Sequence, residues 1–361
     1  MTISQRRSLA AVGIPLVAAV LTLSACSRIG GDTAAAPSGT AAASSNATAP
    51  ELRLGYFPNV THAAALIGVD KGYFTKHLGS TKLTTQTFNA GPDEVSALLG
   101  GSLDAAFIGS GPAINAFSKS DGAAVRLVAG ATSGGAQLVV KPNITSQQNL
   151  VGKTIADPQL GNTQDVSLKT YLSRNNLAGK VTVTNMSNSE VLGEFQKNDV
   201  QGGWLPEPYS SELVLTGGAH VLVDESSLWP DGQFPTTVLI VRTQFLEQYP
   251  GTVRALVQGE LDAVNYEQSD QTGAETAVND QLKQLTGKPL PQPVLDRAFS
   301  KIKLTVDPLA SDFPELVKDQ VIAGISKTAP GLTGFADLTQ LNSVLTAAGK
   351  QPISAGSLGG N

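Results

Sequence analysis

Residues 105–117, with the sequence AAFIGSGPAINAF, decide the fold that we expect for this chain. The apolar run Ala105–Ile108 is short and ends at a glycine, which is typical of a buried strand. Residues 109–112 (GSGP) then turn the chain, and Ala113–Phe117 follows as a helical stretch. A strand that passes through a small polar turn directly into a helix is the repeating unit of α/β proteins with a largely parallel sheet.

The same alternation of strand and helix runs along most of the chain after residue 50. We expect strands at Leu52–Phe57, Lys82–Phe88, Ala105–Ile108, Arg126–Ala129, Gln137–Val140, Thr154–Ala156, Val181–Thr184 and Thr236–Val241. We expect helices from about His62, at Asp93–Leu99, Ala113–Phe117, Gln164–Arg174 and Thr252–Tyr266, and around Pro314–Ser326. The pattern predicts an α/β fold whose sheet is mostly parallel.

The length of the folded part predicts two lobes. Roughly 310 residues follow residue 50, which is above the size at which a single hydrophobic core usually stops growing. A break at residues 141–143 (KPN) separates two runs of strand and helix. We therefore expect one lobe from residues 51–137 and 238–361 and a second from residues 138–237, with the chain crossing between them near Gln137 and returning near Thr237.

The N-terminal residues predict export and lipid attachment. Arg6 and Arg7 precede an apolar stretch that is too short to span a bilayer, which is typical of a signal peptide over residues 1–25. The only cysteine, Cys26, ends the sequence LSAC at residues 23–26, which resembles a bacterial lipobox. A chance cysteine behind an ordinary signal peptide is the alternative. We expect the chain to be lipid-anchored through Cys26 on the extracytoplasmic face of the cell membrane.

Composition after Cys26 predicts a tether and argues against nucleic-acid binding. Residues 26–50 consist almost entirely of small and polar residues, which predicts a flexible tether. Without Arg6 and Arg7, 23 basic residues face 30 acidic ones, a formal charge of −7. An acidic chain without basic blocks is a poor candidate for binding nucleic acid.

Signals for catalysis or metal binding are weak. Residues 152–154 (GKT) resemble the end of a phosphate-binding loop, but Gln147 stands where that motif needs glycine. His62, His77 and His220 are scattered, and neither a zinc motif nor a nucleophile elbow is present. We expect no catalytic residue, no metal and no cofactor.

Three turns between a strand and a helix carry the residues most suited to binding a small molecule. In open α/β sheets ligands bind beyond the carboxyl ends of strands, where helix N-termini offer free N–H groups and a partial positive charge. The alternative is that these turns only cap their helices. The candidates are Asn59, Thr61 and His62 in the first turn, Ser110 and Gly111 in the second, and Asn162, Thr163 and Gln164 in the third.

A fourth candidate segment is residues 204–208 (WLPEP), which follows two glycines. Trp204 could form a wall for an apolar part of a ligand, and Glu207 could accept hydrogen bonds from an amine. Placement of Trp204 in the core, with Glu207 starting a helix, is an equally good interpretation. Trp229 is expected to be structural.

The ordered set of these motifs resembles the extracytoplasmic solute-binding proteins of ABC importers, in the nitrate, sulfonate and taurine group. The resemblance runs from about Leu52 through the C-terminal helices. It depends on residues 55–58 (GYFP), 70–74 (DKGYF), 107–112 (FIGSGP), 161–165 (GNTQD) and 204–208 (WLPEP).

The resemblance implies a two-lobed type II periplasmic-binding fold, with two mixed sheets, flanking helices and a two-strand hinge. It implies a monomer that captures a small solute between the lobes and delivers it to a permease with its ATPase. Aliphatic sulfonate or taurine is the usual solute of such sequences. Because no Arg or Lys stands in the candidate turns, nitrate, bicarbonate and a pyrimidine or other heterocycle stay open as alternatives. A non-transport structural lipoprotein and a pyrimidine-synthesis enzyme are the competing functions.

Overall fold

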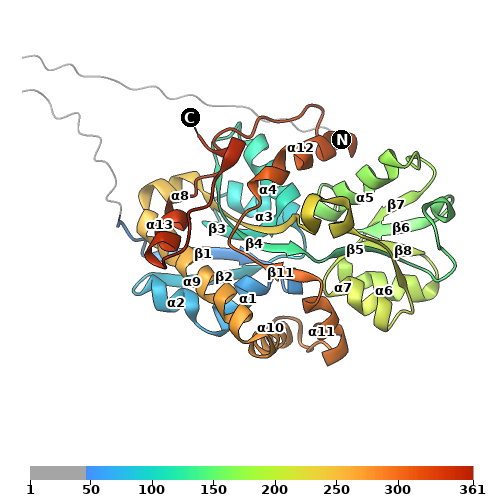
Figure 1. Ribbon diagram of the computed structural model, residues 1–361, viewed down its shortest axis with the longest axis horizontal. Coiled ribbons are helices and arrows are strands. Elements are labelled where there is room, and N and C mark those ends of the chain that lie inside the picture. The colour runs from blue at the N-terminus through green and yellow to red at the C-terminus, as the bar shows by residue number, and fades with distance from the viewer. Residues whose placement is uncertain (1–45, 361) are drawn as a thin grey trace, which may run out of the picture. The chain divides into compact units, whose positions relative to one another are not determined.

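Two mixed β-sheets organise residues 46–360, the part of the chain that this computed structural model describes (Figure 1). The first sheet has six strands in the order β11-β4-β10-β3-β1-β2, and the second has five in the order β7-β6-β8-β5-β9. The first comprises β1 (Glu51–Tyr56), β2 (Lys82–Thr87), β3 (Ala105–Gly109), β4 (Val125–Gly134), β10 (Pro235–Arg242) and β11 (Ile302–Leu304). The second comprises β5 (Ala136–Val140), β6 (Thr154–Asp157), β7 (Thr182–Asn185), β8 (Gly202–Pro206) and β9 (His220–Asp224).

Helices accompany both sheets. Those between the strands of the first sheet are α1 (Ala63–Asp70), α2 (Tyr73–Leu78), α3 (Gly91–Leu99) and α4 (Ser110–Lys119). Those between the strands of the second are α5 (Thr163–Arg174), α6 (Asn188–Lys197) and α7 (Tyr209–Leu215). The remainder are α8 (Thr243–Gln248), α9 (Pro250–Ser269), α10 (Gln271–Thr286), α11 (Gln292–Phe299), α12 (Phe313–Ile322) and α13 (Thr339–Ala347). Short 3-10 helices include η1 (Val60–His62), η2 (Gln147–Leu150), η3 (Glu225–Leu228), η4 (Pro230–Gly232), η5 (Ala310–Asp312) and η6 (Gly356–Leu358).

The chain passes between the sheets twice, and this gives the two-lobed architecture that we expected. It leaves the first sheet at the end of β4 and enters the second at β5 through Gly135 alone. It returns between β9 and β10. Gly135 has a φ of 81°, a conformation that favours glycine, and a Cβ there would lie 2.5 Å from Ile302. The single-residue crossover therefore requires glycine.

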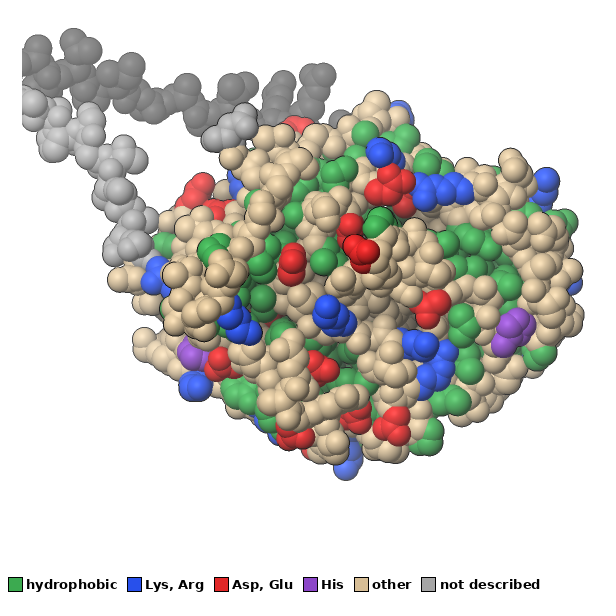
Figure 2. Space-filling model, in the orientation of Figure 1, with side chains coloured by type: hydrophobic (Ala, Val, Ile, Leu, Met, Phe, Trp, Pro, Cys, Tyr) green, Lys and Arg blue, Asp and Glu red, His purple; other side chains and the backbone are tan. Residues whose placement is uncertain are grey.

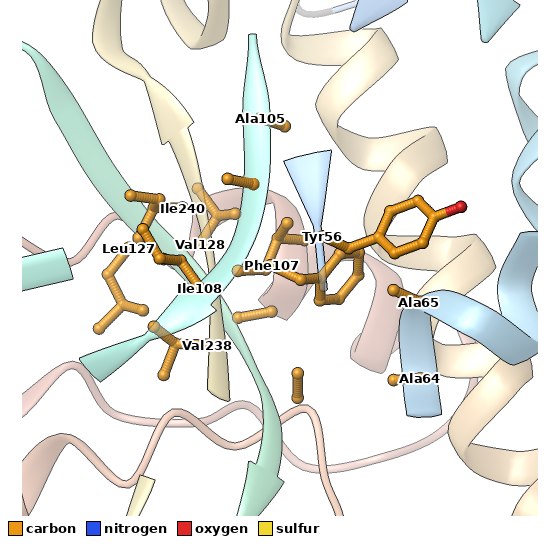
Figure 3. Close-up of a cluster of buried hydrophobic side chains, with 14 of the residues drawn as sticks. Tyr56, Ala64, Ala65, Ala105, Phe107, Ile108, Leu127, Val128, Val238 and Ile240 are labelled. Carbon is orange, nitrogen blue, oxygen red and sulfur yellow. The ribbon is translucent and has the colours of Figure 1, made fainter. Parts of the chain in front are cut away.

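The core of the first sheet is continuous and apolar. β3 lies between β1 and β10, and all five of its residues are buried. Because both faces of this central strand are covered, it is apolar at every position and does not alternate with polar residues. In Figure 3 the side chains of Ile108 and Phe107 point to opposite sides of β3, Ile108 towards the side of Leu127 and Val238 and Phe107 towards the side of Tyr56. The second sheet has its own buried clusters on its two faces.

The predicted strands and helices are confirmed to within a few residues, but the prediction of mostly parallel pairing is wrong. β1 pairs in parallel with β2 and β3, and β6 pairs in parallel with β7 and β8. β10 is antiparallel to β3 and β4, β11 is antiparallel to β4, and β5 is antiparallel to β8 and β9. The strands on either side of each crossover run against their neighbours. Both sheets are therefore mixed, as the resemblance implied.

The signal peptide, Cys26 and most of the predicted tether lie outside the described residues. Residues 46–50, which composition placed in the tether, instead pack on the folded body. Ala49 is buried, its N–H donates to Thr252 Oγ1 at 2.7 Å, and its carbonyl accepts from Thr81 Oγ1 at 2.6 Å. Over residues 46–360, no helix combines the length and apolar character that a membrane crossing requires.

Candidate functional site

The N-terminal turns of α4 and α5 meet where the two lobes face each other. Gly111 N donates to Thr163 Oγ1 at 3.3 Å, so the first turn of α4 is bonded to the first residue of α5. Beside them, Gly91 N donates to Asn162 Oδ1 at 3.4 Å, and Asn115 Nδ2 donates to the Gly161 carbonyl at 3.3 Å. The predicted second and third turns therefore come together from opposite lobes.

Small residues at the end of β3 and the start of α4 allow this approach. A Cβ added to Gly109 would lie 2.3 Å from Thr163 Oγ1, and one added to Gly111 would lie 3.3 Å from Thr163 Cα. Both helices begin with residues whose N–H groups have no partner within the helix, and their positive ends converge. The junction therefore suits an acceptor-rich or anionic group.

Three buried hydroxyl groups at this edge of the first sheet make no hydrogen bond among the described residues. They belong to Ser110, Thr132 and Thr237. Thr237 is paired with both Gly109 and Thr132 across the antiparallel strands, and Ser110 directly follows Gly109. A buried hydroxyl without a partner is costly, so three at one edge of a sheet mark a place where a ligand can supply acceptors or donors.

The first predicted turn lies at the crossover between the lobes. η1 packs against β4 and β10, and Thr61 Oγ1 donates to Asn59 Oδ1 at 2.8 Å. His62 points elsewhere, because its Nδ1 accepts from Phe57 N at 3.2 Å and its ring stacks on Phe57. Burial lowers the pKa of His62 to about 3, which keeps the imidazole neutral. The structure therefore gives His62 a local structural contact.

A carboxyl pair supports the loop before α5. Asp165 Oδ2 accepts from Gly161 N at 2.8 Å, and its Oδ1 lies 2.6 Å from Lys169 Nζ. Burial and the neighbouring Asp165 raise the pKa of Asp157 to about 9, so Asp157 is protonated at neutral pH. This arrangement fixes the loop that carries Asn162, whose Nδ2 in turn donates to Gln164 Oε1 at 3.3 Å.

Trp204 lies in the core of the second sheet, where it packs against α5. Its side chain is fully buried, its Nε1 donates to Glu225 Oε2 at 2.6 Å, and its ring packs against Tyr171. Burial raises the pKa of Glu225 to about 7. The indole N–H is thus already used in a hydrogen bond to Glu225.

Glu207 has a basic partner that sequence reasoning missed. Arg297, in the last turn of α11, places Nη1 3.2 Å from Glu207 Oε1 and 2.7 Å from Ser211 Oγ. Burial raises the pKa of Glu207, and the hydrogen bonds from Ser211 and the charge of Arg297 oppose that rise. Ninety residues separate the two side chains in sequence. The only sequence signal was a lone acidic residue in an apolar segment.

Helix α12 also contributes contacts that the sequence did not predict. Gln320 Nε2 donates to the Gly111 carbonyl at 2.9 Å, and Asp319 pairs with Arg174 of α5 at 2.5 Å. A cavity of about 350 Å³ adjoins the junction at Pro112 and Gly161. A cavity of about 620 Å³ lies between α5, η3 and α12. The C-terminal region therefore encloses the junction from one side.

Basic and acidic side chains are interspersed over the visible face in Figure 2. Within residues 46–360, no group of three or more His, Cys, Asp or Glu side chains is arranged to hold a metal ion.

Two α/β lobes, joined at a hinge and facing each other through helix N-termini, define a periplasmic-binding-protein architecture. The family comparison goes further: the chain belongs to the NMT1-like family, whose model matches residues 45–279.

Sequence relatives include binding proteins. The chain is 28% identical over 190 residues to the taurine-binding periplasmic protein of Escherichia coli, covering 53% of this chain and 58% of that protein. It is 27% identical over 215 residues to a protein of Brucella abortus described as a binding protein, covering 57% and 63% of the two chains. The matches thus span less than two thirds of these relatives.

Solved structures share the fold over most of the chain. The alkanesulfonate-binding protein SsuA of Xanthomonas axonopodis, bound to MOPS, superposes with a TM-score of 0.64 at 22% identity, covering 77% of this chain and 93% of that one. The nitrate-binding protein NrtA of Synechocystis superposes with a TM-score of 0.69 at 14% identity, covering 85% and 92%. At these identities the likeness establishes the fold.

Proposed function

We propose that the protein is the extracytoplasmic solute-binding component of an ABC importer. It captures one small solute in the cleft between its lobes and delivers it to a membrane permease driven by an ATPase. The observation that carries this proposal is the junction of α4 and α5, where two helix N-termini face each other beside the unpartnered hydroxyls of Ser110, Thr132 and Thr237. Such a site binds a solute and has no group placed to transform it.

An aliphatic sulfonate or taurine is the solute that we infer. A sulfonate presents three acceptor oxygens and one negative charge, which match hydroxyl and backbone N–H donors at two positive helix ends. Relatives that bind taurine and alkanesulfonate support this choice. The residues that we propose to contact the solute are Asn59, Thr61, Ser110, Gly111, Asn162, Thr163 and Gln164, together with the unpartnered hydroxyl groups of Thr132 and Thr237.

The proposed attachment of the chain to the membrane rests on the sequence alone. We infer that the chain is exported, modified with lipid at Cys26 and held as a monomer at the outer face of the cell membrane. Two acyl chains suffice for stable attachment, whereas one is marginal.

The test is a thermal-shift screen of the full-length protein in detergent, followed by calorimetry. The panel contains ethanesulfonate, taurine, nitrate, bicarbonate and pyrimidines. A solute at 100 times its dissociation constant is expected to stabilise the fold by about 2.7 kcal/mol.

Variants then locate the site. Ser110→Ala and Thr163→Ala are each expected to lower the affinity for the solute by roughly tenfold, since each removes one hydrogen bond to a charged group. If both variants kept wild-type affinity for a solute that binds, the proposed cleft would be wrong. A solute bound only among the heterocycles would keep the importer role and reject the sulfonate.

A further inference from the structure

Arg297 joins α11 to three side chains of the second lobe, which stand on β5, on α7 and in the turn between β8 and α7. Besides its contacts with Glu207 and Ser211, its Nη2 donates to Gln137 Oε1 on β5 at 2.8 Å. The Glu207 side chain is fully buried, and the Arg297 side chain is 17% exposed. Removing one partner of such a pair leaves the other charge buried without compensation.

Glu207 lies at the crossover between the lobes. Its backbone N–H donates to the Gly135 carbonyl at 2.8 Å, at the crossover between β4 and β5. A Cβ on Gly135 would lie 3.2 Å from Thr61 Cγ2 and 3.8 Å from Glu207 Cγ. Thr61 and Glu207 therefore flank the same crossover residue from opposite lobes. A carboxylate in this position acts on any charged solute held near Thr61, and it does so strongly because the surroundings are buried.

We propose that Arg297 is a positioning residue that sets the charge preference of the solute site. By holding and neutralising Glu207, it lets the cleft accept an anion although a buried carboxylate stands beside it. This inference rests on the proposed function. Without Arg297, and at a pH high enough to ionise Glu207, such as pH 8, the carboxylate repels a sulfonate that carries no amine and attracts an ammonium group.

The experiment compares two probes of similar size on the full-length protein in detergent. Ethanesulfonate carries only a negative charge, whereas taurine also carries an ammonium group. Calorimetry on Arg297→Gln is expected to show the taurine-to-ethanesulfonate affinity ratio rising by about tenfold or more, because one unscreened charge contact is worth at least that factor. Glu207→Gln is expected to lower the ratio. Arg297→Gln with Glu207→Gln is expected to restore it, and Arg297→Lys to keep it near the wild-type value.

A purely structural role for Arg297 predicts something different. Both probes would then lose affinity by the same factor in Arg297→Gln, and an unchanged ratio would overturn the inference.

A measurement without solute separates this inference from the proposed function. The melting temperature of Arg297→Gln is expected to fall further below wild type at pH 8 than at pH 5, because the uncompensated carboxylate is charged at the higher pH. The double variant is expected to lose this pH dependence. A loss of stability that is equal at both pH values would overturn the pairing. Failure of the wild type to bind either probe would instead overturn the sulfonate assignment, while the pH comparison would still decide the pairing.

Discussion

The contact between α4 and α5 predicts that Gly109→Ala separates the two lobes. The new Cβ would lie 2.3 Å from Thr163 Oγ1, whereas ordinary contacts between heavy atoms are about 3.5 Å, so Thr163 has to retreat by roughly 1 Å. Gly109 has a φ of −62°, which alanine adopts freely, so the substitution acts through this clash and not through the backbone. Overpacking of this kind costs about 1 to 3 kcal/mol.

The expected result is a loss of both stability and affinity. If solute binding requires the closed contact, the same 1 to 3 kcal/mol corresponds to roughly 5- to 150-fold weaker binding. Calorimetry and thermal unfolding of the full-length protein measure the two effects. Thr163→Ala, added to Gly109→Ala, removes the clashing hydroxyl and is expected to recover stability.

A matched control is available in α6. A Cβ on Gly193 would meet no atom within 4 Å, so Gly193→Ala is expected to leave affinity unchanged and to raise stability slightly. Wild-type stability and affinity in Gly109→Ala, or no recovery on adding Thr163→Ala, would refute the reasoning.

Three further predictions concern separate parts of the chain. Thr237→Val keeps the side-chain shape and removes an unpartnered hydroxyl. We therefore expect weaker solute binding by calorimetry and equal or greater stability without solute. A loss of stability would show that the hydroxyl has a partner. Burial raises the pKa of Glu260 well above its usual value, so the unfolded chain ionises first as pH rises above about 4.5 and the contribution of this group to stability falls with rising pH. Glu260→Gln should flatten this decline in urea denaturation between pH 5 and 7, and an unchanged slope would contradict it. Cys26→Ser should release the protein from membranes without changing its melting temperature, whereas persistent membrane binding on fractionation would point to a retained signal peptide.

The local pattern was enough to predict the main elements and the junction of α4 and α5. Residues 105–117 form a buried strand followed at once by a helix, as a short apolar run bounded by turn residues predicts. Ser110 and Thr163 were predicted as ligand contacts because ligands bind where a strand ends and the next helix begins. The structure brings the first turns of their two helices together.

The features that the sequence did not predict depend on contacts between residues that are far apart in the chain. The direction of β10 depends on where the chain returns after the whole second lobe, and no local periodicity encodes it. Arg297 reaches Glu207 only because α11 packs against α7. His62 stands beside a candidate turn, yet the fold directs its Nδ1 to Phe57 N, a choice that depends on burial. Whether Trp204 or Glu207 touches a solute stays a prediction.

The packing of residues 46–50 on the folded body has a mechanical consequence. Traction along the chain from its N-terminal side meets the body at residues 46–49. Asn46 accepts a hydrogen bond from Arg254, Ala47 accepts one from Gly251, and Ala49 is bonded to Thr252 and Thr81, so these contacts share the load before it reaches β1. β1 is held in shear between β2 and β3, the geometry in which several hydrogen bonds must break at once. Such a load therefore falls on the first lobe, whose sheet contains β1, β2 and β3, before it reaches the second.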